Sequence, residues 1–233
     1  MISFKQYLLE DIELFPSKPT NFKSVKFDDK FIEKTMTSGV GTNVTRHDMG
    51  DIHPDYSLHK FTHHSGPHHS NLNEFFVVHK PTNMVVSSIE GMSIQNRKTN
   101  KDTYNIIHVG VDPKHRKKKT GISLPFHAYE KLSDSGHIVR SDTLQTVGGA
   151  HLWNTIRKHP KLKDRVFMLP STHESISDGT PLMIPAHNLK DDEIWSEGSI
   201  EGNNKSKKIN ATSIYDRNYR NISSRILELH PPK

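Results

Sequence analysis

The segment that most constrains this fold is a strand pattern that runs into a basic, glycine-marked turn and then into a helix pattern. β-Branched residues alternate up to Val111, the run 114–119 holds five Lys or Arg side chains and one His, and Gly121 precedes the apolar spacing of a helix. Backbone N–H groups at such a turn, backed by several cations, suit phosphate oxygens. The segment therefore predicts a strand–turn–helix unit with a pyrophosphate-binding loop at its turn.

The flanking sequence predicts further strands and helices around this unit. Apolar spacing predicts helices over 24–36, 122–132 and 148–159, and strands over 56–62, 73–79, 84–91, 104–111, 137–146 and 165–169. Pro81 and Asn83 predict a hairpin turn between two strands, Gly136 a left-handed helix cap, and Trp153 an inward-facing position. This order indicates an α/β (α+β) fold with a mixed, largely antiparallel sheet covered by helices.

The two ends of the chain differ from its middle. Apolar residues among Lys and Glu predict an amphipathic helix over 1–14, and the stretch 196–208 is a polar linker rich in Ser, Gly, Asn and Lys. Tyr215, Tyr219, Ile222, Ile226 and Leu229 recur at helical spacing and predict a C-terminal helix. We therefore expect an N-terminal segment over 1–23, a domain over 24–170 and a C-terminal extension over 171–233.

Composition limits the class of protein. The 233 residues include no cysteine, the hydrophobic fraction is 32%, and the mean hydropathy is −0.70. Disulfides and thiolate metal sites are excluded, and no apolar run reaches membrane-spanning length. The sequence predicts a soluble protein without a membrane partner.

The turn segment resembles the acyl-coenzyme A (acyl-CoA) loop of the GNAT superfamily of N-acetyltransferases, whose signature is V-x-P-x-x-R-x-x-G-x-G/A. The following stretch, SDTLQTVGGAHLW, resembles the next strand and helix of that family. The resemblance covers residues 56–170. It implies a GNAT-like sheet and acetyl-CoA or coenzyme A as cofactor.

The resemblance also implies roles for individual residues. The pantetheine chain would bond to the backbone of Val109 and Val111, whose side chains would be core. The pyrophosphate would bind the turn and the helix start at Lys118, Lys119, Thr120, Gly121, Ile122 and Ser123. Two departures from the signature are present. Arg116 stands five residues before Gly121 instead of three, so either Lys118 takes its place or the loop has two extra residues, and Ser123 replaces the second small residue.

The positions that carry proton transfer in many family members are changed in this chain. Asn105 stands where the family keeps a glutamate base, and Trp153 stands where it keeps a tyrosine acid. Neither side chain can transfer a proton. His108, Glu90 and His151 are candidate substitutes by their chemistry, since imidazole titrates near neutrality and burial raises a carboxylate pKa toward it. The alternative for each of them is a structural role.

Histidines and aspartates are concentrated in the region 47–69. The set comprises His47, His53, His59, His63, His64, His68 and His69, beside Asp48, Asp51 and Asp55. Imidazoles and carboxylates are zinc or iron ligands. Because Gly66 and Pro67 interrupt the paired histidines and no H-x-x-x-H lies on a helix pattern, a polar loop is favoured and no metal is expected.

The first ten residues, MISFKQYLLE, resemble N-terminal segments of tailed-phage proteins, including capsid-targeting sequences of internal head proteins. The leading hypothesis is an acetyl-CoA-dependent N-acyltransferase acting on an amine in the host cytoplasm. The alternative is a catalytically degenerate GNAT-fold virion protein, with other virion proteins as partners. The sequence argues against a nucleic-acid partner, because the turn lacks interleaved aromatic residues and +6 over 233 residues is modest.

Overall fold

The computed structural model describes residues 22–37, 43–64, 71–96, 101–141, 147–169, 183–190, 194 and 226–232. These residues form two compact units. Unit 1 contains the described residues up to Glu90 together with His108–Leu124, and unit 2 contains Gly91–Ile107 and the described residues from Pro125 onward. Two long strands, β5 and β6, contribute residues to both units, and each unit is described by itself below.

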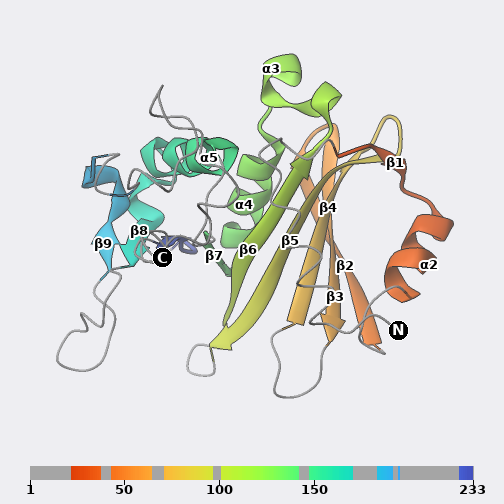
Figure 1. Cartoon of the computed structure of the whole chain (residues 1–233), viewed down its shortest axis with the longest axis horizontal. Coiled ribbons are helices and arrows are strands. Elements are labelled where there is room, and N and C mark those ends of the chain that lie inside the picture. The colour runs from red at the N-terminus through yellow and green to blue at the C-terminus, as the bar shows by residue number, and fades with distance from the viewer. Residues whose placement is uncertain are drawn as a thin grey trace, which may run out of the picture. The chain divides into compact units, whose positions relative to one another are not determined.

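Unit 1 is built on an antiparallel sheet (Figure 1). Its strands are β1 (Val25–Lys26), β2 (Asn43–His53), β3 (Tyr56–His64), β4 (Asn71–His79), the first part of β5 (Met84–Asn96) and the last part of β6 (Lys101–Val111). The order is β2-β3-β4-β5-β6, and β1 pairs with β5. Asn83, with φ +50°, lies in the turn between β4 and β5 and confirms the predicted hairpin.

Helix α2 (Asp29–Thr37) packs on the apolar core of unit 1. The core consists of Phe27, Val44, Phe61, Phe76, Val78 and Val85, with Phe22, Phe31 and Ile32 against it. The prediction of a helix from residue 24 is wrong in its first turn. Val25 pairs with Val85 as part of β1, and the Asp28 carboxylate then accepts the Phe31 N–H at 3.0 Å, which fixes the helix start.

The sequence favours a polar loop for the histidine-rich region, and this prediction is wrong. His47 and His53 lie on β2, and His59, His63 and His64 lie on β3. The two strands pair antiparallel, with His59 opposite Asp48. Apolar Val44 and Phe61 enter the core between these polar residues, so the region has enough apolar surface to form strands. His68 and His69 lie outside the described residues.

Unit 2 combines helices with strands. Its elements after β6 are α4 (Leu124–Asp134, which enters unit 2 at Pro125), β7 (Ile138–Arg140), α5 (Val147–Lys158), η2 (Lys163–Arg165), β8 (Val166–Leu169), β9 (Ile184–Pro185), η3 (Ala186–Asn188) and β10 (Ile226–Leu229). The strand order is β6-β7-β10-β8-β9. β6 and β7 pair in parallel and are joined by α4, whereas the β7–β10, β10–β8 and β8–β9 pairs are antiparallel. The predicted mixed α/β class is confirmed at this level.

The helices of unit 2 bury the faces that their spacing predicts. Tyr129 of α4 and Trp153 of α5 are both buried, and their rings lie 5.7 Å apart. Helix α4 ends at Gly136, which has φ +92° and donates its N–H to Ser133 O, while His137 donates to Leu132 O. The predicted glycine cap is therefore confirmed. Of the predicted strand 137–146, the structure describes β7 only, and 142–146 lie outside the described residues.

The predicted C-terminal helix is wrong where the structure describes it. Ile226 and Leu229 belong to strand β10, which lies between β7 and β8. Leu227, Glu228 and Leu229 are all buried, so side chains on both faces of this strand are covered. Its four residues therefore show no alternation of apolar and polar side chains from which a strand could be predicted. Tyr215, Tyr219, Ile222, the segment 1–14 and the linker 196–208 lie outside the described residues.

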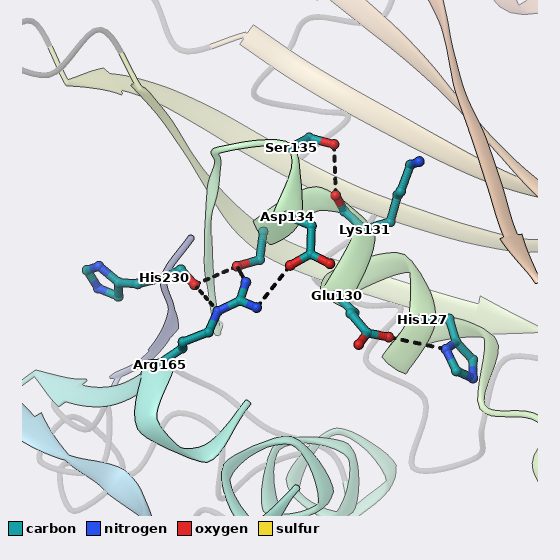
Figure 2. Close-up of polar contacts among 8 residues, drawn as sticks. His127, Glu130, Lys131, Asp134, Ser135, Arg165 and His230 are labelled. Atoms are coloured by element: carbon teal, nitrogen blue, oxygen red, sulfur yellow. Dashed lines mark hydrogen bonds and ion pairs between the residues drawn. The ribbon is translucent and has the colours of Figure 1, made fainter. Parts of the chain in front are cut away.

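A guanidinium group joins the end of β10 to the end of α4 (Figure 2). Arg165 donates from Nε to His230 O at 2.8 Å, from Nη1 to Asp134 Oδ1 at 2.9 Å, and from Nη2 to Ser133 Oγ. Ser133 Oγ in turn donates to His230 O at 2.6 Å. This network fixes the chain after β10 on the helix that connects β6 with β7.

Candidate functional site

The basic loop, defined here as residues 113–123, begins on a buried carboxylate. Asp112 accepts hydrogen bonds from the Lys114 N–H at 2.8 Å, the Ser24 N–H at 3.1 Å and the Ser24 hydroxyl. Burial alone would raise the pKa of Asp112, but the hydrogen bonds from Ser24 and Lys114 outweigh it and lower the pKa. Asp112 therefore caps the 3-10 turn η1 (Pro113–His115) as an ionised group and holds the loop to β1.

Most of the loop amides already donate to protein oxygens. The short helix α3 (Lys117–Thr120) forms because Lys119 and Thr120 donate to Arg116 O, and Gly121, with φ +75°, donates to Lys117 O at 2.8 Å. Ile122 donates to Thr120 Oγ1 at 3.2 Å. Four of the six amides that the resemblance assigns to pyrophosphate, those of Lys119, Thr120, Gly121 and Ile122, are thus engaged. In this conformation these four amides are already bonded within the loop, so a phosphate would contact the lysine side chains instead.

The loop is also held to the neighbouring strands by His115. Its Nδ1 lies 3.0 Å from the hydroxyl of Tyr56 on β3, and its ring lies 5.0 Å from that of His79 on β4. Burial lowers the pKa of His115, and the neighbouring His79 lowers it further, so His115 is neutral at pH 7. Sequence reasoning missed this contact, because 59 residues separate Tyr56 from His115.

Strand β6 has a partly open apolar face just before the loop. β7 pairs only with Thr103, Tyr104 and Asn105 of β6. On the remainder of β6, Val109 and Val111 are half-buried and Ile107 is 42% exposed. The expectation that Val109 and Val111 are core is therefore wrong. The buried face of β6 is the opposite one, where Phe22 packs against Gly110.

The structure assigns the proton-transfer candidates to different units. Glu90 on β5 and His108 on β6 are half-buried residues of unit 1. His151 is an exposed residue of α5 in unit 2, where it lines a shallow depression with Lys158 and His159. No common site is therefore described for the three side chains.

The two positions where this chain departs from the catalytic pattern have different environments. Trp153 is 2% exposed and packs in the core of unit 2. Asn105 is half-buried at the β7 register, and its buried Oδ1 has no hydrogen-bond partner among the described residues. A buried acceptor without a donor is uncommon in folded proteins, and a bound ligand or water satisfies such an atom. Asn105 Oδ1 is therefore a hydrogen-bond acceptor on β6 that an N–H group of a ligand can use.

The histidines of β3 contact polar side chains of their own strand and of the neighbouring strands. His59 Nε2 lies 3.1 Å from Ser57 Oγ, and His63 Nε2 lies 2.7 Å from Glu74 Oε2. Within the described ranges, no three His, Cys, Asp or Glu side chains are grouped so that they could share a metal ion. These contacts explain how the strands accommodate polar histidine side chains.

In the part of the chain that the structure describes, no helix is long and apolar enough to cross a membrane. A scan against models of known protein families and a search of curated proteins find no match to this chain.

Proposed function

We propose that this protein is an acetyl-CoA-dependent N-acyltransferase of the GNAT type, acting on an amine. The proposal rests mainly on the structure at the end of β6. β7 pairs with β6 no further than Asn105, and the strand then shows a partly open apolar face at Ile107, Val109 and Val111. A pantetheine arm needs such a face together with strand backbone groups, and the basic loop follows directly.

The charged groups of the loop suit the other end of the same ligand. Lys117, Lys118 and Lys119 are exposed on α3, close in sequence to the open end of β6. Ammonium groups stabilise phosphate oxygens without needing the amides that α3 already uses. The loop therefore offers charge where the nucleotide end of coenzyme A would lie.

Acyl transfer from acetyl-CoA requires that an amine nitrogen attack the thioester carbon and that a proton pass from the amine to a base. The C–S bond then breaks, and coenzyme A leaves as a thiolate that takes up a proton. Acetyl-CoA supplies the activated acyl group. Asn105 Oδ1 of unit 2 can accept a hydrogen bond from an N–H group, and the candidates for the base in unit 1 are the imidazole of His108 and the carboxylate of Glu90. His151 belongs to the same proposal as the candidate from unit 2.

Titration calorimetry with acetyl-CoA tests the proposal, using two substitutions of Gly121. We expect saturable binding to the wild type and to Gly121→Asn, and about tenfold weaker binding to Gly121→Val. A Cβ at this position meets no atom within 4 Å, so steric contact is not the cause. The cause is φ +75°, which asparagine tolerates and which costs a β-branched residue about 1–2 kcal/mol.

Two other results of the calorimetry would contradict these expectations. Absence of heat with the wild type would refute the acyltransferase. Equal binding by all three proteins would show that the loop conformation at Gly121 does not contribute. Circular dichroism of both variants checks that a loss of binding does not reflect unfolding.

A second function, a catalytically degenerate GNAT-fold protein of a phage virion, is favoured by a separate observation. Four loop amides donate to the protein itself, and the two proton-transfer positions hold Asn105 and Trp153. Such a protein keeps the scaffold and loses the chemistry. Quantitative mass spectrometry of purified phage particles decides the matter, since a fixed stoichiometric copy number is expected and its absence removes this function.

A further inference from the structure

The basic loop holds more positive charge than the described residues around it neutralise. Lys114, Arg116 and the three lysines of α3 lie within six residues, and no Asp or Glu occurs between Pro113 and Tyr129. All four lysines are exposed. Among the described residues, no ion pair joins any of these five side chains to a carboxylate.

These charges stand on a backbone that is fixed before any ligand binds. The Asp112 carboxylate holds the start of the loop, and Tyr56 contacts His115 at 3.0 Å. Arg116 Nε donates to Val111 O at 3.3 Å, and the amides of residues 119–121 close the turn of α3. A preformed backbone lowers the entropy cost of binding, so the lysines can act together on one partner.

The orientation of the lysines favours an extended polyanion over a compact one. Successive residues of an α-helix point about 100° apart, so Lys117, Lys118 and Lys119 fan out around α3 and do not converge on one point. The amides that would surround a single phosphate are turned into the loop. A chain of separated phosphates meets this arrangement better than one phosphate group does.

We propose, against the expectation from the sequence, that the basic loop binds the phosphate backbone of double-stranded DNA, independently of its sequence. Contact with a duplex backbone needs no aromatic residues, and the net charge that is modest over 233 residues is concentrated in the five Lys and Arg residues of 114–119. The loop has no aromatic side chain apart from the half-buried His115, so it lacks the rings that stack on single-stranded bases. Asn and Gln, which read adenine, are absent, and Arg116, which could read guanine, is half-buried with its Nε bonded to Val111 O. Its one large aliphatic side chain, Ile122, is half-buried, which leaves little apolar surface for a membrane. What remains exposed is charge, which is the requirement for contact with a phosphate backbone.

The strength of this interaction follows from the number of lysines. Four phosphate contacts give a slope of about −3.6 for the logarithm of the binding constant against the logarithm of salt concentration. Raising salt from about 50 mM to about 200 mM should then weaken binding roughly a hundredfold. Two duplexes of unrelated sequence should bind equally.

Fluorescence anisotropy with labelled 20-base-pair duplexes tests the proposal, using the full chain. The test variant carries Lys117→Glu, Lys118→Glu and Lys119→Glu, and a milder variant carries Gln at the same positions. A matched control carries Lys26→Glu, Lys30→Glu and Lys34→Glu, which are exposed lysines of unit 1 outside the loop and give the same change in net charge. We expect more than tenfold weaker binding for the loop Glu variant, and a salt slope smaller by about 2.7 for the Gln variant.

Several results would overturn the proposal. They are no duplex binding by the wild type at low salt, an equal loss in the control variant, or tighter binding to single strands or to vesicles containing anionic lipid. The proposed acyltransferase stands or falls separately. Duplex binding without heat from acetyl-CoA would refute the enzyme and leave this inference, and the opposite pair of results would refute this inference alone.

Discussion

Replacing Glu228 with glutamine should lower the free energy of unfolding by about 3 kcal/mol. The carboxylate is 4% exposed on β10. Its Oε1 accepts from both Arg140 Nε, at 2.7 Å, and Arg140 Nη2, and its Oε2 lies 2.9 Å from His230 Nε2. Glutamine keeps the shape but leaves the Arg140 charge without a counter-ion. Because Arg140 is 26% exposed, we expect the lower end of the range for broken buried pairs.

The matched control is an ion pair on the surface. Lys80 Nζ lies 2.8 Å from Asp51 Oδ2, but the two side chains are 39% and 60% exposed. Asp51→Asn should therefore cost less than about 1 kcal/mol. Urea unfolding at neutral pH measures both variants, and equal losses would contradict the assignment of a stabilising role to the buried pair.

The pH dependence of the Glu228 effect has a definite sign. Burial would raise the pKa of Glu228, but the hydrogen bond from His230 and the charge of Arg140 outweigh it, so the folded-state pKa lies below the ordinary 4.5. The unfolded chain then binds more protons, and stability rises with pH. The stability difference between wild type and Glu228→Gln should stay constant above the unfolded pKa and shrink as pH falls below 4.5 through the folded pKa.

Gly91→Ala should destabilise the protein by about 2–3 kcal/mol. A Cβ at Gly91 would lie 2.8 Å from the backbone oxygen of Asn105 on the neighbouring strand, and 3.1 Å from a methyl group of Ile106. The backbone oxygen cannot move aside without shifting β6. Glycine is required here because the two strands approach each other closely.

Gly110→Ala is the control for this effect. Its Cβ would lie 3.2 Å from the Cβ of Phe22, a longer contact that a movement of Phe22 by a few tenths of an ångström relieves. Thermal unfolding should show a clearly smaller loss of stability for Gly110→Ala than for Gly91→Ala. The reverse order would show that the close contact at Asn105 O is relieved by a backbone movement.

Sequence patterns predicted those elements that carry a complete local signal. Alternating residues located β3 to β6, the Pro81 and Asn83 pair located a hairpin, and Gly136 located the end of α4. The basic turn was placed correctly between β6 and α4. In each case the residues that decide the structure lie within one or two turns of one another.

The remaining features depend on contacts between distant residues. β10 has four residues and is buried on both faces, so its strand identity comes from pairing with Arg140 and Phe167, far away in the sequence. The half-burial of Val109 depends on how far β7 extends along β6. The engagement of the loop amides depends on a helix of one turn, which is too short to produce a pattern.

The position of β10 has a consequence for protein synthesis. This strand lies between β7 and β8, but it leaves the ribosome after both of them. Until it arrives, each partner has an edge with unpaired N–H and C=O groups, and such edges pair readily with other chains. The nascent chain is therefore most exposed to misassembly between the emergence of Leu169 and that of Ile226, a window in which chaperone binding would matter most.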